Sequence, residues 1–587
     1  METTASMDSQ KQEKNLLQTT KPRTKKGGLI TMPFIIANEA LDKVANVGLH
    51  VNMITYLMQD YHYDPASAAI VMNTWNGVSH FMTIFGAFLS DSYLGRYRVI
   101  SIAIIFELLG LIVLWLTSII HNARPPYCNV FTETGCATPR IGQFLFLVSS
   151  LLLMAIGSGG IRPCSVAFAA DQLNSPENPR NQGIMKSFFN WYYVSVGISV
   201  CISTTLIVYY QIKAGWIKGF GLTVGLMLFS IVMFFLGSPL YVKLKANKNL
   251  FFGLAQVVAA AWKNRHLTLP PKDSTNWHFK NGANLVEPTD KLRFLNRACL
   301  IRNKASDLDS NGMPTDPWGL CTVRQVEELK AIIKVMPIWS TGFIVAIGLN
   351  QLTFLVAQAN TMDRHLFSHF EVPATNFSVF TILALTIWIA IYDRVLVPLL
   401  SKSKYSRFRG GFTLMQRMGI GISITVLAHM TAALVERRRR RLAIREGLMS
   451  MSAWWLVPQL CLTGLAEAFN AIGQIEFYYS QFPQSMSSIA IGFFGVGFGV
   501  GNLLAGVLVT IVKQVTQRGG RQSWLTRNPN IGHYDYYYWL LAILNGVNLL
   551  YFFLCCWAYG STQDIQTWDD NGEVDNKVKS TEDVEDK

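Results

Sequence analysis

Long apolar stretches, separated by short polar or charged breaks, run along most of this chain. A helix needs roughly 20 mainly apolar residues to cross the hydrocarbon core of a bilayer. Each half of the chain supplies several stretches of about that length. We therefore predict helices near residues 30–58, 66–91, 98–121, 141–167, 187–211, 218–242, 328–357, 375–400, 412–436, 451–481, 486–514 and 534–559.

The breaks predict how these helices are organised. The longest break is rich in charges and holds the Pro270-Pro271 pair, so it is too polar to lie in lipid. We expect an all-α membrane protein of the major facilitator fold, with twelve transmembrane helices in two six-helix halves and a substrate site between the halves. The expected parts are a cytoplasmic N-terminal tail, a six-helix bundle, a central cytoplasmic loop, a second six-helix bundle and a disordered acidic tail, at residues 1–28, 29–244, 245–327, 328–560 and 561–587.

Composition supports the membrane interpretation. The 587 residues are 50% hydrophobic and only 15% charged, which excludes an ordinary soluble protein. The net charge of +14 does not indicate nucleic-acid binding, because the basic residues lie mostly in tails and loops. Basic residues crowd the segment before the first helix, so the positive-inside rule places both termini in the cytoplasm. We expect a multi-pass protein of the plasma membrane, with the vacuolar membrane as the alternative, and a monomer or loose dimer.

One basic run conflicts with this topology. Arg437 to Arg441 follow the ninth predicted helix, on the side expected to face outside. We keep the topology because early segments usually fix orientation. A miscounted helix in the second half is the alternative.

Two cysteines share one short polar loop that should face outside. Cys128 and Cys136 could form a disulfide there, or remain two free thiols.

Three charged residues lie inside the first predicted helix: Glu39, Asp42 and Lys43. Each charge costs roughly 2.5 to 3.5 kcal/mol at the centre of a membrane helix, so such residues persist where they pair or line a wet cavity. Their spacing places them on one face, with Glu39 and Lys43 at i, i+4. The two interpretations are a functional proton-coupling cluster and a static salt bridge that packs helices together.

Other helices add candidates for the same cavity. Arg162 follows a glycine-rich stretch in the fourth predicted helix and could neutralise Glu39 or Asp42. If substrate draws off that cation, protonation of the carboxylate follows. Glu467 in the tenth helix has a proton-linked or substrate-contacting role as one interpretation and a structural role as the other. For Glu107 the sequence favours a structural role.

The turn between the second and third predicted helices carries Asp91, Gly95, Arg96 and Arg98. An acid at a helix end, a glycine and paired arginines predict an interhelical charge network that stabilises one gating state. Asp393 and Arg394 could do the same in the second half. We find no phosphate loop and no Cys/His metal spacing, so we expect no catalytic residues, no metal and no cofactor, with a proton gradient as the driver.

These residues resemble the plant nitrate transporter 1/peptide transporter family, part of the proton-dependent oligopeptide transporter group. The resemblance spans nearly the whole chain. It rests on Glu39-x-x-Asp42-Lys43, the Gly86 to Arg98 turn, Gly159 to Cys164, Phe188 to Tyr192, Asp316-Pro317-Trp318, Gln325 to Glu328, Pro337-Ile338-Trp339, Tyr392 to Val395 and Gly473 to Tyr479.

The resemblance implies proton symport by alternating access, with Glu39, Asp42, Lys43 and Arg162 in proton coupling. It places Lys43, Trp339, Leu349, Gln351 and Glu467 at the substrate site. Asp42 stands where the family usually has glutamate. Leu349 stands where some nitrate-transporting relatives have histidine, and leucine neither donates a hydrogen bond nor carries charge.

These departures shape the expected function. We predict a symporter that moves nitrate or a small anionic organic solute, such as a hormone or specialised metabolite. A di- or tripeptide symporter is one alternative. A transporter-like sensor, which signals cavity occupancy through the central loop or the acidic tail, is the other.

Overall fold

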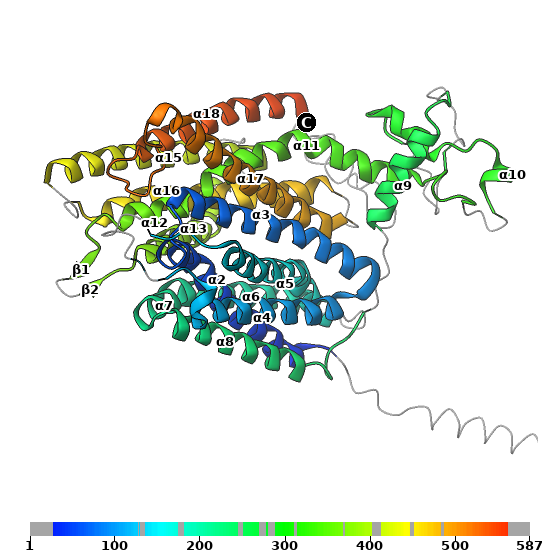
Figure 1. Ribbon diagram of the computed structural model, residues 1–587. Helices are drawn as coiled ribbons and strands as arrows, with labels where there is room; N and C mark the ends of the chain where they lie inside the picture. The colour runs from blue at the N-terminus through cyan, green and yellow to red at the C-terminus, as the bar shows by residue number, and fades with distance from the viewer. Residues whose placement is uncertain are drawn as a thin grey trace, which may run out of the picture.

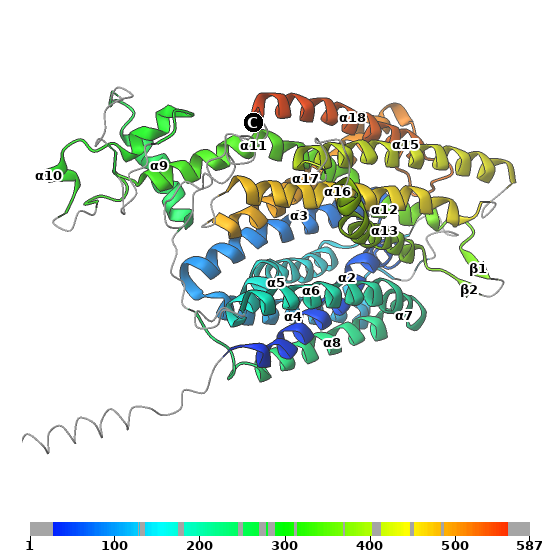
Figure 2. The ribbon, with the colours of Figure 1, turned by 180° about the vertical axis from the view of Figure 1, so that it is seen from behind.

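The two halves of the molecule pack side by side as bundles of long helices (Figures 1 and 2). This computed structural model describes residues 27–126, 128, 136–173, 181–244, 250–268, 278–279, 288–309, 314–367, 370–401, 412–446, 451–482 and 486–560. Residues 1–26 of the predicted N-terminal tail and the whole predicted acidic tail, residues 561–587, lie outside these ranges.

The first half begins with a short 3-10 turn, η1 (Leu29–Thr31), and continues into a helical bundle. Proline stands in the first turn of its first two long helices, where a missing N–H costs nothing. The remaining elements are α2 (Met32–Gln59), α3 (Pro65–Leu89), η2 (Ser90–Leu94), α4 (Arg96–Ile119), η3 (His121–Ala123), α5 (Ile141–Leu173), α6 (Asn181–Ile202), η4 (Ser203–Ile207), α7 (Val208–Ala214) and α8 (Trp216–Leu236).

The second half repeats the pattern of long helices interrupted by short irregular turns. Its first helix starts with a capping box in which Thr322 and Gln325 bond each other's backbone. Its elements are α11 (Val323–Leu349), α12 (Leu352–Ala359), β1 (His365–Phe367), β2 (Phe370–Glu371), η6 (Ala374–Ser378), α13 (Val379–Ile391), η7 (Tyr392–Leu396), α14 (Val397–Ser401), α15 (Leu414–Glu446), η9 (Ala453–Leu456), α16 (Val457–Gln481), α17 (Ser487–Thr516), η11 (Arg518–Gly520) and α18 (Tyr534–Tyr559).

Within the described ranges, nine helical segments are long and apolar enough to cross a membrane. They begin at Arg96, Ile141, Val194, Trp216, Val323, Ala374, Leu414, Ala490 and Tyr534. The twelve predicted spans also include α2, α3 and α16, which are 28, 25 and 25 residues long and pack in the same bundle. The three charges of α2 explain its lower apolarity. The count of twelve transmembrane helices therefore stays a prediction. The lengths of these three helices agree with it.

The central segment forms a folded unit beyond one end of the bundle (Figure 1). Its elements are α9 (Leu250–Lys263), η5 (Arg293–Cys299) and α10 (Lys304–Asp307). A small apolar core joins α9 and η5 to the start of α11 and includes Val257, Leu295, Cys299, Cys321 and Val326. At the opposite end, β1 and β2 pair in antiparallel fashion, so a two-stranded hairpin accompanies the otherwise helical bundle.

Helix α15 is longer than the sequence predicted. The expected helix ended near residue 436, whereas α15 continues through the basic run to Glu446. Arg439 donates to both carboxylate oxygens of Glu436 at 2.7 Å, and both side chains are buried. Arg439 also donates to Asn530 Oδ1. Local sequence does not reveal these partners, so the predicted helix ends before the basic run.

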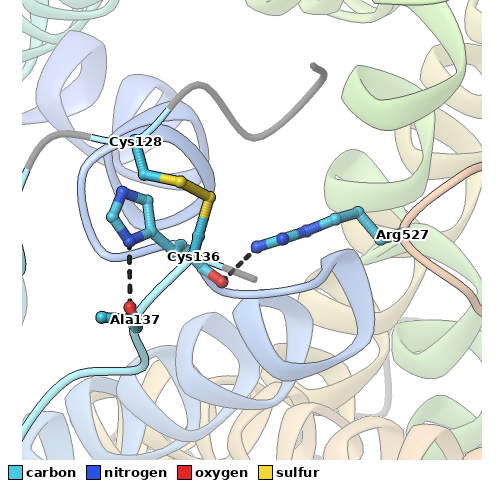
Figure 3. Close-up of a disulfide and its surroundings, with 5 residues drawn as sticks. Cys128, Cys136, Ala137 and Arg527 are labelled. Carbon is cyan, nitrogen blue, oxygen red and sulfur yellow. Dashed lines mark hydrogen bonds between the residues drawn. A yellow bond between two sulfur atoms is a disulfide. The ribbon is translucent and has the colours of Figure 1, made fainter. Parts of the chain in front are cut away.

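The cysteine loop identifies the outer end of the bundle. Cys128 and Cys136 form a disulfide with their Cα atoms 5.7 Å apart, which is one of the two outcomes left open by the sequence (Figure 3). The Ala137 carbonyl lies 3.0 Å from His62 Nδ1, and Arg527 donates to the His62 carbonyl at 2.5 Å. Disulfides persist in oxidising surroundings, so this end is the expected external one.

Candidate functional site

The charged cluster of α2 is built as its spacing predicts. Lys43 Nζ lies 2.9 Å from Glu39 Oε1 and 3.2 Å from Asp42 Oδ2, so one ammonium bridges both carboxylates. Asp42 also accepts a hydrogen bond from Asn46 at 2.8 Å. Glu39 and Asp42 are buried, whereas the Lys43 side chain keeps 22% of its surface. The cluster carries two negative charges against one positive charge.

Neighbouring helices complete the surroundings of Glu39. Ser165 of α5 and Tyr192 of α6 lie beside its carboxylate. Glu107 of α4 is buried at 3% exposure within electrostatic range of Asp42 and Lys43, and its Oε2 has no hydrogen-bond partner among the described residues. The sequence favours a structural role for Glu107, which stays a prediction, and the structure places this residue within electrostatic range of the cluster.

Glycines allow this close assembly. A side chain at Gly157 would collide with Glu107 and Ala103 of α4, and one at Gly159 would collide with Met82 of α3. The glycine-rich stretch therefore lets α5 approach both helices, as its sequence predicted.

Arg162 does not pair with either carboxylate. Its side chain is exposed, and in the described part of the chain it makes no ion pair with Glu39 or Asp42, whose cation is Lys43. It lies within electrostatic range of Lys43, His50 and His80. The arrangement leaves one exposed guanidinium beside a cluster that already contains its own cation.

A polar group that was not predicted lies next to this guanidinium. His50 Nε2 of α2 lies 2.5 Å from Asn76 Oδ1 of α3, and the His50 ring packs 5.0 Å from that of Trp75. The His80 ring faces Phe498 of the second half at 6.1 Å. Polar residues within apolar helices were the available signal for this group.

Two candidates of the second half lie in α11, and a third, Gln351, directly precedes α12. The Trp339 indole N–H donates to the Phe493 carbonyl at 2.8 Å, and its ring stacks on Phe493 at 4.4 Å. Leu349 is half-buried in an apolar cluster. Gln351 donates to the Ile347 carbonyl at 2.6 Å. Trp339 and Leu349 stand ten positions apart, roughly 15 Å along a helix, so they do not line one small subsite.

Helix α16 carries a polar face that lies against α11. Gln474 donates to Asn470 Oδ1 at 2.5 Å and accepts from the Tyr478 hydroxyl at 3.3 Å. Gln474 lies against Gly342 of α11, where a larger residue would collide with it. Glu467, one turn earlier, is half-buried and makes no hydrogen bond or ion pair among the described residues. The i, i+4 spacing of Asn470, Gln474 and Tyr478 was the signal that sequence reasoning missed.

Arg96 of the predicted gating turn pairs with Asp91 and also with a second acid that the sequence did not indicate. Gly95 has φ +78°, which fits the tight turn before α4. Arg96 contacts Asp171 of α5 at 2.6 Å, whereas Asp91 lies 3.8 Å away. Arg98 is exposed. Arg394 is also exposed, and the side chain of Asp393 lies outside the described part of the structure.

Polar contacts between the two halves gather at the outer end. Lys513 of α17 lies 2.9 Å from Asp64, and Thr375 donates to Asn52 Oδ1 at 2.9 Å. Asn376 donates to the Thr205 carbonyl at 3.3 Å. A cavity of about 440 Å³ lies at this end. It is lined by Thr55, Gln59, Ile212, Lys213, Asn360, Thr361, Arg364, Glu371, Val372, Pro373 and Ala374.

Comparison with known proteins then identifies the family. Residues 97–525 match the POT family. The chain belongs to the POT family. It is 48% identical over 567 residues to Protein NRT1/PTR FAMILY 1.2 of Arabidopsis thaliana, a match that covers 94% of this chain and 93% of that protein. NRT1/PTR FAMILY 2.13 of the same plant is 39% identical over 556 residues, covering 93% and 89%.

Solved structures agree with this POT fold. A crystal structure of an auto-inhibited POT family peptide transporter matches with a TM-score of 0.68 at 18% identity, covering 92% of this chain and 100% of that chain. A POT family transporter in complex with 5-aminolevulinic acid matches with a TM-score of 0.60 at 13% identity, covering 92% and 99%. This POT-family chain is therefore a membrane transporter with the fold of its family, and not an enzyme.

Proposed function

We propose that this POT-family chain is a proton-coupled symporter that moves nitrate or a small anionic organic solute by alternating access. One observation carries the proposal: Lys43 bridges Glu39 and Asp42 while the Arg162 guanidinium stays exposed nearby. An exposed cation inside a membrane protein attracts an anion, because little water is present to screen it. The substrate is thereby expected to be anionic.

Coupling follows from the charge balance of the cluster. Glu39, Asp42 and Lys43 sum to one negative charge, so Lys43 compensates the two carboxylates only in part, and Arg162 lies within electrostatic range of Lys43. An anionic substrate that engages Arg162 or Lys43 removes part of this compensation. A carboxylate with less compensation binds a proton more readily, so substrate and proton enter together. The exchange needs no metal or cofactor.

The outer contacts between the halves fit a state that is closed to the outside. Lys513 with Asp64 and Thr375 with Asn52 join the halves there. In alternating access these contacts must open before substrate enters from outside. We take the plasma membrane as the site of action.

An uptake panel tests the proposal. Oocytes that express the chain receive labelled nitrate, small organic anions, or di- and tripeptides, each at an acidic and at a neutral external pH. We expect accumulation of an anion that is larger at acidic pH. Peptide accumulation would establish the peptide symporter instead. Occupancy without accumulation, in protein shown to reach the surface, would establish a sensor.

A further inference from the structure

A second pocket lies outside the transport site, between the outer ends of α15 and α18. Its volume is about 320 Å³. Three arginines enter its lining from α15, and aromatic residues enter from α18. The lining residues are Arg437, Arg440, Arg441, Ile444, Asp535, Tyr536 and Trp539.

Part of the basic run is already occupied by protein partners. Arg439 is buried against Glu436, and the Arg438 guanidinium lies 4.5 Å from the centre of the Trp455 ring. Arg440 donates to the Asn530 carbonyl at 3.1 Å and contacts the His533 ring nitrogens at 3.0 and 3.1 Å. Each of these arginines therefore has a structural partner.

Two arginines of the pocket lack such partners. Arg437 and Arg441 are exposed, and within the described residues neither makes a hydrogen bond or an ion pair. They stand at i, i+4 and so lie on one face of α15. The Asp535 carboxylate, 3.5 Å from His533 Nδ1, also lines the pocket, so three guanidiniums stand against one acid. The pocket keeps an excess of positive charge.

Below the pocket, both helices present apolar side chains on the outer surface of the bundle. Leu434 of α15 is 54% exposed and precedes Arg437 by one turn. On α18, Ile543, Val547 and Leu550 are 59–65% exposed at spacings of four and three, which forms one stripe. Tyr536 and Trp539 lie between this stripe and the arginines, as aromatic residues do at the boundary of a membrane.

The pocket lies at the same end of the bundle as the disulfide. Arg440 bonds the Asn530 carbonyl, and Arg527, in the same connection between α17 and α18, bonds His62 beside the disulfide-linked loop. An apolar stripe that ends in basic and aromatic residues matches the change from acyl chain to phosphate in a lipid.

We propose that this pocket binds the phosphate of an acidic phospholipid in the outer leaflet. Arg437 and Arg441 donate charge-assisted hydrogen bonds to the phosphate oxygens, and an acyl chain lies along Leu434, Ile543 and Val547. The basic run, which conflicts with the positive-inside rule, then has a purpose on the outer side. The site is independent of substrate and of proton coupling.

Native mass spectrometry of the purified full-length chain tests this site. Phosphatidylglycerol or phosphatidylcholine with the same acyl chains is added to the protein, and the bound lipid is counted. We expect preferential binding of phosphatidylglycerol, reduced about tenfold or more in the double variant Arg437→Gln/Arg441→Gln, because two charge-assisted hydrogen bonds are lost. The matched control is Arg445→Gln, which removes an exposed arginine outside the pocket lining.

Several outcomes would overturn the proposal. Both lipids carry a phosphate and differ in the net charge of the headgroup, so equal binding of the two by the wild-type chain would contradict a site for an acidic phospholipid. Unchanged binding by the double variant would show that the lipid binds at another site. Displacement of phosphatidylglycerol by an equal concentration of inorganic phosphate would make the pocket a site for free anions. If the double variant does not fold, lipid binding by the wild-type chain is measured with added salt instead. A preference for phosphatidylglycerol that salt does not weaken would contradict the assignment.

Discussion

At the scale of single residues, the chain keeps several charges in an apolar setting by giving each a specific neighbour. Lys43 joins Glu39 and Asp42, and Arg439 joins Glu436. The two groups differ in their access to water. Lys43 keeps part of its surface exposed, whereas Glu436 and Arg439 have exposed fractions of 0% and 1%. Solvent therefore reaches the first group and is excluded from the second.

Replacing Glu39 by glutamine tests proton coupling. The amide keeps the shape of the side chain and cannot take up a proton. We expect surface expression to remain, and uptake at acidic pH to fall to its value at neutral pH, measured in oocytes. Asp42→Glu is the matched variant, because it restores the residue usual in the family and should retain the pH dependence. Unchanged pH dependence in Glu39→Gln would refute the coupling role.

Replacing Glu436 by glutamine tests the buried ion pair. The change leaves the Arg439 guanidinium buried without a counter-charge, which typically costs about 3 to 5 kcal/mol. We expect a clearly lower temperature of thermal unfolding for the purified chain. Glu446→Gln, at the exposed end of the same helix, should unfold like the wild type. Equal unfolding temperatures for both variants would show that the pair adds nothing to stability.

At the scale of elements, helix ranges were predictable and their partners were not. Runs of apolar residues predict the ends of most long helices to within about six positions, because lipid demands an apolar segment of set length, and the C-terminal end of α15 is the exception. Arg96 is different: it finds Asp171 at a separation of 75 residues, which no local pattern indicates. The same holds for Arg162, whose predicted carboxylates are already bridged by Lys43. Pairing depends on how helices pack, which one sequence does not specify.

The central segment offers a test at this scale. Cys299 and Cys321 lie in its small core, and burial raises the pKa of the Cys299 thiol to about 12 and that of Cys321 to about 11. A raised pKa lowers the fraction of reactive thiolate at neutral pH. We expect slow alkylation of both in the folded chain, read peptide by peptide by mass spectrometry.

An introduced cysteine supplies the control for that labelling. Ser306→Cys places a thiol at an exposed position of the same segment, and it should react quickly. Mild denaturation should bring Cys299 and Cys321 to a similar rate. Fast labelling of these two in the folded chain would mean that the segment does not form a stable core against α11.

At the scale of the whole molecule, the two halves are joined by polar contacts at the outer end, while the Arg96 network at the opposite end lies within the first half. In the proposed alternating-access cycle, opening of the outer end therefore breaks contacts such as Lys513 with Asp64. Their side chains are 32% and 26% exposed, so the pair contributes about 0.2 to 1 kcal/mol. One such pair shifts the equilibrium slightly toward the closed outer end, and several pairs together stabilise that state.

Reversing the charges of Asp64 and Lys513 separates a gating role of this pair from a general effect on folding. Asp64→Lys or Lys513→Asp alone places like charges together and should shift the equilibrium between closed and open outer ends about two- to fivefold toward open, as the energy of one exposed pair allows. The double reversal should restore it. Labelling of a cysteine introduced at Thr55, in the outer cavity, reports the opening. Equal labelling in the single and double variants would show that the contact between Asp64 and Lys513 does not control opening of the outer end.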